Sequence, residues 1–230
     1  MNKQNLIINI SNLNKKYLSK NNQYVEIIRN LNFKIESNSK ISIIGPSGSG
    51  KTTLLNIIGL LDSDFEGSYS FNGKDVSLYS EKEKNNIRGL SIGFVHQFFH
   101  LIPELTVIEN VMLPILINKK DNDSYNQSKS ILTQFGLQDR LNYKPIKLSG
   151  GEQQRVAIAR SFINNPDLIL ADEMTGNLDE ETANKIFNFF INYINQHKKT
   201  LIYVTHNKKL SLFADKIYSF NNKGLALKND

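Results

Sequence analysis

Eight consecutive residues, from Gly45 to Thr52, fit the spacing Gly-x-x-x-x-Gly-Lys-[Ser/Thr]. An apolar run at residues 41–44 precedes them and a helical pattern at 52–61 follows, which is the context in which this spacing binds phosphate. Glycines there leave backbone N–H groups at a helix N-terminus, where an anion is stabilised. We predict that Lys51 reaches the β- and γ-phosphates of a nucleotide and that Thr52 reaches Mg²⁺. The predicted nucleotide-binding residues of this segment are Gly45, Pro46, Ser47, Gly48, Ser49, Gly50, Lys51, Thr52 and Thr53.

Two adjacent acids, Asp172 and Glu173, follow a fully apolar run at residues 168–171. A carboxylate at the end of a buried strand can hold the coordination shell of Mg²⁺, and its neighbour can orient or deprotonate a water molecule. Taken alone, the pair would fit a solvated strand end equally well. Because a phosphate-binding loop occurs in the same chain, we interpret the two acids as part of a catalytic site.

A second glycine pair, Gly150 and Gly151, follows Ser149 at the start of a predicted helix at residues 151–163. One interpretation is an ordinary N-cap, because serine is favoured at that position. The other is a second anion site, because the glycines leave bare N–H groups at the helix N-terminus. Since the first loop already holds the chain's own phosphates, a second anion site would require another nucleotide.

The remaining pattern indicates how these motifs are positioned. Strands are predicted at residues 6–10, 27–35, 41–44, 67–73, 92–95, 168–171 and 201–204. Helices are predicted at residues 52–61, 124–135 and 151–163. Strands that alternate with helices favour an α/β fold with a mainly parallel sheet. The segment from about 98 to 161 is mainly helical, so we predict a helical subdomain inserted into a single domain of residues 1–230, with one linker-like stretch at 118–123.

Composition excludes several classes of protein. The sequence has no cysteine, which excludes disulfides, zinc knuckles and cysteine nucleophiles. We see no signal peptide, and the longest apolar stretch, 107–117, is shorter than the roughly 20 residues of a spanning helix, so we expect a soluble chain. The net charge of +6 fits either a nucleic-acid or anionic-membrane surface or a compositional bias. Because the lysines are scattered and form no patch, we favour the bias and expect no nucleic-acid partner.

Taken together, the motifs resemble the full motif set of an ABC transporter ATP-binding subunit, in the right order and over essentially the whole chain. The matching residues are Tyr17, Gly45 to Thr52, Gln97, Leu148 to Gln153, Asp172, Glu173, Gly176, Asn177, Leu178, Asp179 and His206. The resemblance implies a P-loop NTPase core with N-terminal antiparallel β-strands and an inserted helical subdomain. It also implies ATP and Mg²⁺ as cofactors.

The resemblance implies a role for each residue around the chain's own nucleotide. Tyr17 would stack on the adenine ring, and Glu173 would be the catalytic base. Gln97 would link Mg²⁺ and the attacking water to the membrane partner, and His206 would hold the γ-phosphate. The implied metal ligands are Thr52, Gln97 and Asp172, and the implied catalytic residues are Glu173, His206 and Gln97.

In the same family two subunits pair head to tail and trap two ATP molecules. The resemblance therefore implies a homodimer in the ATP-bound state, in which Ser149 and Gly151, with Gly150 between them, bind the γ-phosphate of the opposite subunit's ATP. Asp179 would communicate across the interface. Integral membrane permease subunits are the implied partners, so the chain would lie at the cytoplasmic face of the bacterial inner membrane.

Residues 92–111 closely resemble the ATPase of the lipoprotein-releasing system, whereas residues 171–179 are shared with macrolide-type exporters and the cell-division ATPase. Met174 stands where the family usually has proline, which frees φ and restores an N–H but keeps both acids. Release of lipoproteins from the inner membrane is the function we favour. The alternatives are a macrolide-type exporter, a cell-division complex, or a nucleic-acid-associated ATPase of the same fold.

Overall fold

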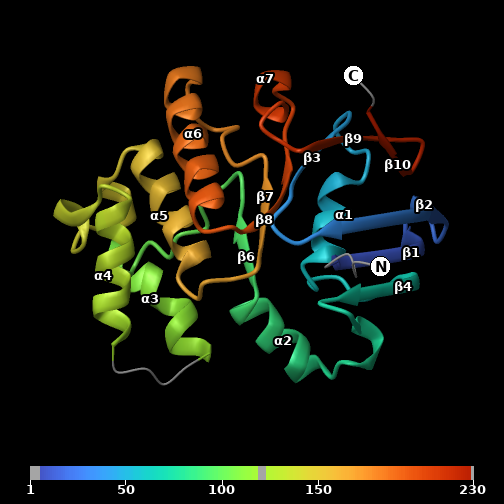
Figure 1. Ribbon diagram of the computed structural model, residues 1–230, viewed down its shortest axis with the longest axis horizontal. Coiled ribbons are helices and arrows are strands. Elements are labelled where there is room, and N and C mark those ends of the chain that lie inside the picture. Colours follow the sequence, from blue (N-terminus) through green and yellow to red (C-terminus); the bar gives the residue numbers. More distant parts are fainter. Residues whose placement is uncertain (1–5, 119–122, 229–230) are drawn as a thin grey trace. The chain divides into compact units, whose positions relative to one another are not determined.

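The computed structural model describes residues 6–118 and 123–228, which form two compact units. Within the described chain, the first unit combines residues 6–85 with 200–228, and the second comprises residues 86–118 and 123–199. Most of the linker-like stretch predicted at 118–123 lies outside the described residues. Parallel strands, helices and an antiparallel N-terminal sheet are all present, which confirms the predicted α/β class (Figure 1).

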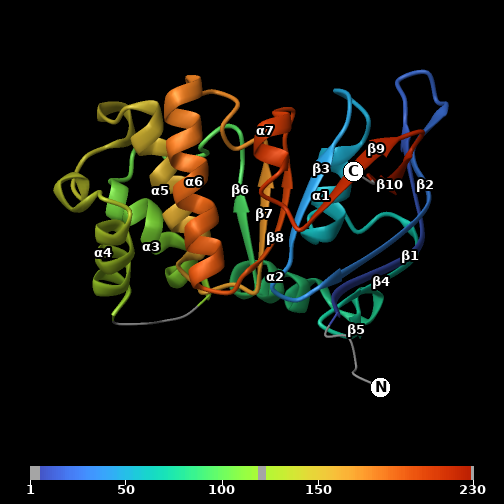
Figure 2. The ribbon, with the colours of Figure 1, turned by 45° about the horizontal axis from the view of Figure 1, so that its top comes forward.

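The antiparallel sheet of the first unit is built around β1 (Leu6–Leu18), which lies between β2 (Tyr24–Glu36) and β4 (Glu66–Phe71). The two-residue strand β5 (Lys74–Asp75) pairs with β4. Figure 2 shows the long ribbons of β1 and β2 side by side. For β1 and β2 the sequence predicted only residues 6–10 and 27–35, while the strand predicted at 67–73 corresponds to β4. Register shifts along the β1–β2 pair interrupt the alternation of apolar and polar residues, so the pattern hid how far both strands extend.

A second set of strands in the first unit carries the phosphate-binding loop. Its members are β3 (Lys40–Ile44), β8 (Thr200–Val204), β9 (Lys216–Asn221) and β10 (Gly224–Leu227). β3 lies between β8 and β9 and is parallel to both, while β10 is antiparallel to β9. All five residues of β8 are buried, as expected for an interior parallel strand. The helices of this unit are α1 (Lys51–Ile58) and α7 (Lys208–Ser211).

The second unit contains two parallel strands, β6 (Ile92–Val95) and β7 (Leu168–Asp172). Its helices are α3 (Val107–Asn118), α4 (Ser124–Gln134), α5 (Gly150–Phe162) and α6 (Glu180–Gln196). One more helix, α2 (Glu81–Leu90), crosses the boundary between the units. The structure confirms α4, α5, β6 and β7 to within about two residues of their predicted ends.

The sequence prediction missed α2 and α6. The apolar face of α6 recurs at helical spacing and is buried at Ile186, Phe187, Phe190 and Ile194, so a search for 3.6-residue periodicity would have found this helix. Its aromatic side chains extend the core, where the rings of Phe162 and Tyr193 meet edge to face at 4.8 Å. Among the described residues, no helix is long and apolar enough to cross a bilayer.

Candidate functional site

The phosphate-binding loop joins β3 to α1 in the first unit, as predicted. Gly50 adopts a φ of 113°, and a Cβ there would lie 2.8 Å from Ile27 Cγ2, so this position requires glycine. The side chain of Lys51 folds back over the loop, and its Nζ donates to the carbonyls of Gly45 at 3.0 Å and Pro46 at 2.7 Å. The ammonium group is therefore held against the loop that is predicted to wrap the phosphates.

Tyr17 lies beside the helix that follows this loop. Its hydroxyl donates to Asp62 Oδ2 at 2.9 Å, and Lys15 Nζ lies 4.6 Å from the centre of its ring. Burial and the hydrogen bond with Asp62 raise the pKa of Tyr17, while the hydroxyl of Thr53, a residue of α1, acts in the opposite direction. Thr52, the predicted metal ligand on the first turn of α1, is exposed. Lys15 and Asp62, which contact the Tyr17 side chain and fix its orientation, were not predicted from the sequence.

His206 follows the C-terminal end of β8. Because β8 is parallel to β3, with Val204 opposite Ile43, the C-terminal ends of the two strands open at the same edge of the sheet. The phosphate-binding loop leaves β3 at that edge, and His206 follows β8 there. Asn207 then caps α7 by accepting from Lys209 N at 2.9 Å.

Glu173 directly follows β7 in the second unit and has a φ of 46°, in the left-handed region that few residues other than glycine adopt. Its carbonyl accepts from Gly176 N at 2.8 Å, which closes a tight turn after the strand. Met174, in the position where proline is usual, is 3% exposed, so its side chain is part of the buried core. The strained backbone at Glu173 is characteristic of functional sites, where surrounding contacts hold such a conformation in place.

Gln97 lies at the same edge of the second unit's strands, because β6 and β7 are parallel and Val95 is opposite Ala171. The Gln97 amide donates from Nε2 to Asn177 Oδ1 at 3.2 Å, and Asn177 Nδ2 donates to the Gln97 carbonyl at 3.0 Å. The structure therefore brings Gln97 together with the turn that carries Glu173. Asn177 belongs to the motif at residues 176–179, but no separate role was predicted for it.

Ser149 is the N-cap of α5. Its Oγ accepts from Glu152 N at 3.2 Å, and a carboxylate oxygen of Glu152 accepts from Ser149 N at 2.9 Å, which makes a capping box. Arg140 Nε holds the other oxygen of that carboxylate at 3.0 Å. The N-cap interpretation is thus confirmed, while a further role of Ser149, Gly150 and Gly151 in binding an anion stays a prediction.

Asp179 caps α6 in a similar way, because its Oδ1 accepts from Thr182 N at 2.9 Å. The hydrogen bonds that it accepts from this helix start lower the pKa of Asp179. Its predicted role across a subunit interface stays a prediction, as do the catalytic, nucleotide-binding and metal-binding roles assigned above from the sequence.

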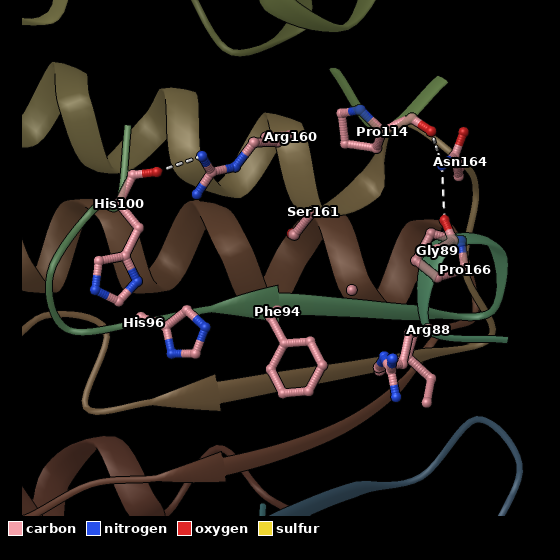
Figure 3. A pocket seen from close by; sticks show the side chains of 12 residues that line it. Arg88, Gly89, Phe94, His96, His100, Pro114, Arg160, Ser161, Asn164 and Pro166 are labelled. Atoms are coloured by element: carbon pink, nitrogen blue, oxygen red, sulfur yellow. Dashed lines mark hydrogen bonds between the residues drawn. The ribbon is translucent and has the colours of Figure 1, made fainter. Parts of the chain in front are cut away.

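A pocket of about 370 Å³ lies beside β6 in the second unit, and the sequence did not predict it (Figure 3). Phe94, His96, His100 and Arg160 are among its lining residues, and none of the residues that line it is acidic. Arg160 donates to the carbonyl of His100 at 2.6 Å, the bond drawn in Figure 3, and to that of Phe99 at 2.9 Å. Burial and the nearby His100 lower the pKa of His96, against a smaller effect of Asp172.

Comparison with known proteins agrees with this arrangement. Residues 28–176 match the family model described as ABC transporter. The chain is 43% identical over 206 residues to the lipoprotein-releasing system ATP-binding protein LolD of Syntrophus aciditrophicus, an alignment that covers 89% of this chain and 92% of that protein. It is 42% identical over 211 residues to the macrolide export ATP-binding/permease protein MacB of Bdellovibrio bacteriovorus, covering 92% of this chain but 32% of that longer protein.

Among solved structures, the chain is similar to the ATP-binding cassette MJ0796, whose dimer was determined bound to ADP and Pi. The TM-score is 0.87 at 36% sequence identity, and the match covers 96% of this chain and 98% of that one. The family model covers more than half of the chain, and the relatives match it along most of its length. The chain therefore belongs to the ABC transporter family, as one of its ATP-binding cassettes.

Proposed function

We propose that this chain hydrolyses ATP and that Glu173 is the base that takes a proton from the attacking water. The observation that carries the proposal is the turn after β7, which holds Glu173 in a strained backbone conformation. Asn177, four residues after Glu173, is hydrogen-bonded to Gln97, so the turn and Gln97 are close together. Lys51 would bind the β- and γ-phosphates, His206 the γ-phosphate, and Tyr17 the adenine ring. Such phosphoryl transfer is accelerated mainly by positioning and by stabilisation of charge.

We infer that Mg²⁺ is the second cofactor. The proposed donors are the Thr52 hydroxyl, the Gln97 amide oxygen and the Asp172 carboxylate, and oxygen ligands of this kind suit Mg²⁺. The described residues include no group of three or more acidic, histidine or cysteine side chains that could hold a metal ion by themselves. The proposed donors include one carboxylate, and Mg²⁺ is usually bound through one or two carboxylates together with substrate phosphates. Bound Mg²⁺ would neutralise charge that develops on the phosphates.

We propose that two copies of the chain close around two ATP molecules. Ser149, Gly150 and Gly151, at the N-terminus of α5, would then bind the γ-phosphate held by the opposite copy, since a helix N-terminus favours an anion. The similarity to MJ0796, which was solved as a dimer with ADP and Pi, supports this arrangement. Asp179, next to the helix start of α6, would transmit the state of one copy to the other.

We propose that the cassette drives membrane-spanning permease subunits that extract lipoproteins from the inner membrane, and that it lies at the cytoplasmic face. The similarity to LolD along 89% of the chain supports this choice of cargo. The comparable identity to MacB keeps macrolide export as the second candidate. A cell-division complex is a third candidate, supported only by the shared motif at residues 171–179.

The segment after Gln97 is the surface we propose for docking of the permease. Phe98 is 64% exposed and Ile102 is 40% exposed, so these apolar side chains are not part of the core. His96 and His100, which flank Phe98 in the chain, line the pocket of Figure 3. A short cytoplasmic helix of the permease could dock there, as amphipathic helices do in apolar grooves, and would thereby act on Gln97.

The proposal is tested with the chain co-expressed with the membrane proteins encoded beside its gene and reconstituted into liposomes that contain a labelled lipoprotein. We expect ATP to release the lipoprotein into the soluble fraction and Lys51→Ala to abolish release. If macrolides stimulate the ATPase activity of the complex and lipoproteins do not, the second candidate is the correct one. If the wild-type complex does not hydrolyse ATP at all, the proposed activity is wrong.

A further inference from the structure

The side chain of Gln97 is held by a residue far away in the sequence, Asn177, through two hydrogen bonds. Nε2 of Gln97 donates to Oδ1 of Asn177 at 3.2 Å, and Nδ2 of Asn177 donates back to the carbonyl of Gln97 at 3.0 Å. The two residues are 80 positions apart and both belong to the second unit. The pair therefore connects the segment after β6 to the turn after β7.

The two bonds fix the orientation of both amides. A backbone carbonyl can only accept, so the group of Asn177 that faces the Gln97 carbonyl must be its NH₂. The oxygen of Asn177 then faces the side chain of Gln97, which must present its own NH₂ in return. Oε1 of Gln97 consequently takes no part in the two hydrogen bonds between these residues. A hard cation such as Mg²⁺ binds amide oxygen and not amide nitrogen, so the pair sets which atom of Gln97 is available to the metal.

Gly176 packs against the same amide from another side. A Cβ placed on Gly176 would lie 2.9 Å from Nε2 of Gln97, which is closer than real side chains approach. Gly176 also donates from its N–H to the carbonyl of Glu173 at 2.8 Å. The residue that makes room for the Gln97 amide is thus hydrogen-bonded to the residue proposed as the base.

The loop that carries Asn177 has anchors that do not involve Gln97. The Glu173–Gly176 turn closes one end, Leu178 N donates to the Thr175 carbonyl at 3.2 Å, and Asp179 caps α6. Asn177 is itself exposed, so its two hydrogen bonds compete with water and contribute little to the stability of the fold. Removing them should therefore change the orientation of Gln97 and leave the loop in place.

We propose that Asn177 is a positioning residue, which orients the Gln97 amide so that its oxygen is directed to Mg²⁺ at a fixed place relative to Glu173. This inference rests on the proposed Mg²⁺-dependent ATP hydrolysis. Partners that orient a metal ligand through a hydrogen bond typically change metal affinity or activity about 10- to 100-fold when they are replaced. An effect of that size is expected here on the dependence of nucleotide binding on Mg²⁺.

The test uses Asn177→Leu, which removes both hydrogen bonds at similar size, and Asn177→Asp, which keeps the acceptor and places a carboxylate oxygen against the Gln97 carbonyl. Binding of a fluorescent ATP analogue is titrated first in EDTA and then against increasing Mg²⁺. In EDTA, both variants should bind the analogue within about two-fold of wild type. The Mg²⁺ concentration that gives half of the change in affinity should rise about ten-fold or more in both.

Two further variants make the result specific. Gly176→Ala perturbs the Gln97 amide without touching Asn177 and should shift the Mg²⁺ dependence in the same direction. Asn126→Leu is the matched control, because Asn126 is an exposed α4 residue whose amide donates only to Asp123 Oδ1 among the described contacts, at 2.8 Å. It should leave the Mg²⁺ dependence unchanged. If Asn177→Leu lowers the melting temperature by more than a few degrees, the pair contributes to folding and the positioning role is wrong.

Failure of this inference can be told apart from failure of the proposed function. If wild type responds to Mg²⁺ and Asn177→Leu responds at the same concentration, Asn177 does not position Gln97, while the proposed hydrolysis is unaffected. If nucleotide binding by wild type does not respond to Mg²⁺, the metal assignment is wrong, and the inference fails with it.

Discussion

Arg160 donates from Nη1 to the carbonyl oxygen of His100 at 2.6 Å, although the two residues are 60 positions apart. His100 has a φ of 47°, a conformation that needs support from its surroundings. A second bond from the same guanidinium holds the carbonyl of Phe99 at 2.9 Å. The segment after Gln97 is therefore hydrogen-bonded to α5, the helix whose N-cap is Ser149.

Replacing Arg160 with methionine should destabilise the chain, because two backbone carbonyls lose a charged donor. Two such bonds together contribute about 3 kcal/mol, which corresponds to a fall in melting temperature of roughly 6–12 °C for a chain of this size. Differential scanning calorimetry measures the change. Arg29→Met is the control, because Arg29 is 64% exposed and pairs with Glu26 at the surface. Equal melting temperatures for the two variants would mean that the bonds of Arg160 contribute nothing net.

Glu173→Gln should bind ATP as wild type does but stop hydrolysis, because the amide keeps the shape of the side chain and loses its basicity. A dimer with two trapped ATP molecules should accumulate, which size-exclusion chromatography with Mg²⁺ and ATP detects. Glu104→Gln, at an exposed position, is the control and should hydrolyse ATP normally. Near wild-type turnover by Glu173→Gln would show that another residue is the base.

Ser149→Arg should abolish ATPase activity while a single copy still binds nucleotide, because Ser149 is proposed to act on the nucleotide of the opposite copy. Loss of the N-cap itself costs about 1 kcal/mol, so the variant should remain folded. Ser149→Thr preserves a capping oxygen and serves as the control. Labelled-ATP binding and an activity assay decide the outcome. If the monomeric variant no longer binds ATP, the motif acts on the chain's own nucleotide.

Polar substitution of the aromatic pair after Gln97 should uncouple the cassette from its permease. Phe98→Asn and Phe99→Asn should keep basal ATPase activity but lose co-purification with the permease and release of substrate. Leu78→Asn, at a residue that is 81% exposed in the first unit, is the matched control. Because Phe99 is half-buried, the melting temperature of Phe99→Asn must also be measured. A large fall in this melting temperature together with loss of basal ATPase activity would place Phe99 in the core.

Lowering the pH should weaken the hydrogen bond between Tyr17 and Asp62. Burial acts to raise the pKa of Asp62, but the hydrogen bonds from Lys15 and Tyr17 outweigh it and hold the pKa below its usual value. A carboxyl group with a depressed pKa stabilises the fold above its unfolded-state pKa of about 4, and this contribution is lost as the pH falls below that value. Asp62→Asn should therefore reduce the free energy of unfolding at pH 7 by roughly 1.5–3 kcal/mol.

The decisive measurement is how the difference in free energy of unfolding between wild type and Asp62→Asn depends on pH. Chemical denaturation at several pH values should show the wild-type advantage shrinking below pH 4, as the carboxyl group becomes protonated in the folded state too. Asp64→Asn provides the comparison, because Asp64 is 94% exposed and also pairs with Lys15. A difference between wild type and Asp62→Asn that is constant down to pH 2 would show that the charge of Asp62 is not what matters.

The placement of several candidate residues on their elements was predictable, because these residues lie in short local patterns. Lys51 follows its glycines at a fixed spacing, and Asp172 ends an apolar run, so a single sequence was sufficient to place them on a loop and at a strand end. Ser149 was likewise predictable as an N-cap, since Glu152 follows three residues later. These features depend on neighbours in the chain, which the sequence displays directly.

The features that escaped prediction depend on contacts between distant segments. Nothing near Asn177 indicates that its amide faces Gln97, and nothing near Arg160 indicates that it holds His100. The left-handed backbone of Glu173 was hidden for a related reason, because local preference argues against it and such a conformation needs support from surrounding contacts. The register shifts along β1 also arise from pairing, since the partner residues lie on β2 and β4.

The position of Lys51 has a consequence for ligand selectivity. Its ammonium donates to the carbonyls of Gly45 and Pro46. The proposed binding of a nucleotide would exchange these acceptors for phosphate oxygens, so the gain in free energy would be the difference between the two sets of bonds. A ligand that lacks the β- and γ-phosphates offers no oxygens to replace the carbonyls of Gly45 and Pro46. Adenosine or its monophosphate would therefore leave the hydrogen bonds of Lys51 unchanged. We therefore expect the proposed phosphate site to discriminate among adenine compounds by the length of the phosphate chain, because Lys51 must exchange its backbone partners for phosphate oxygens.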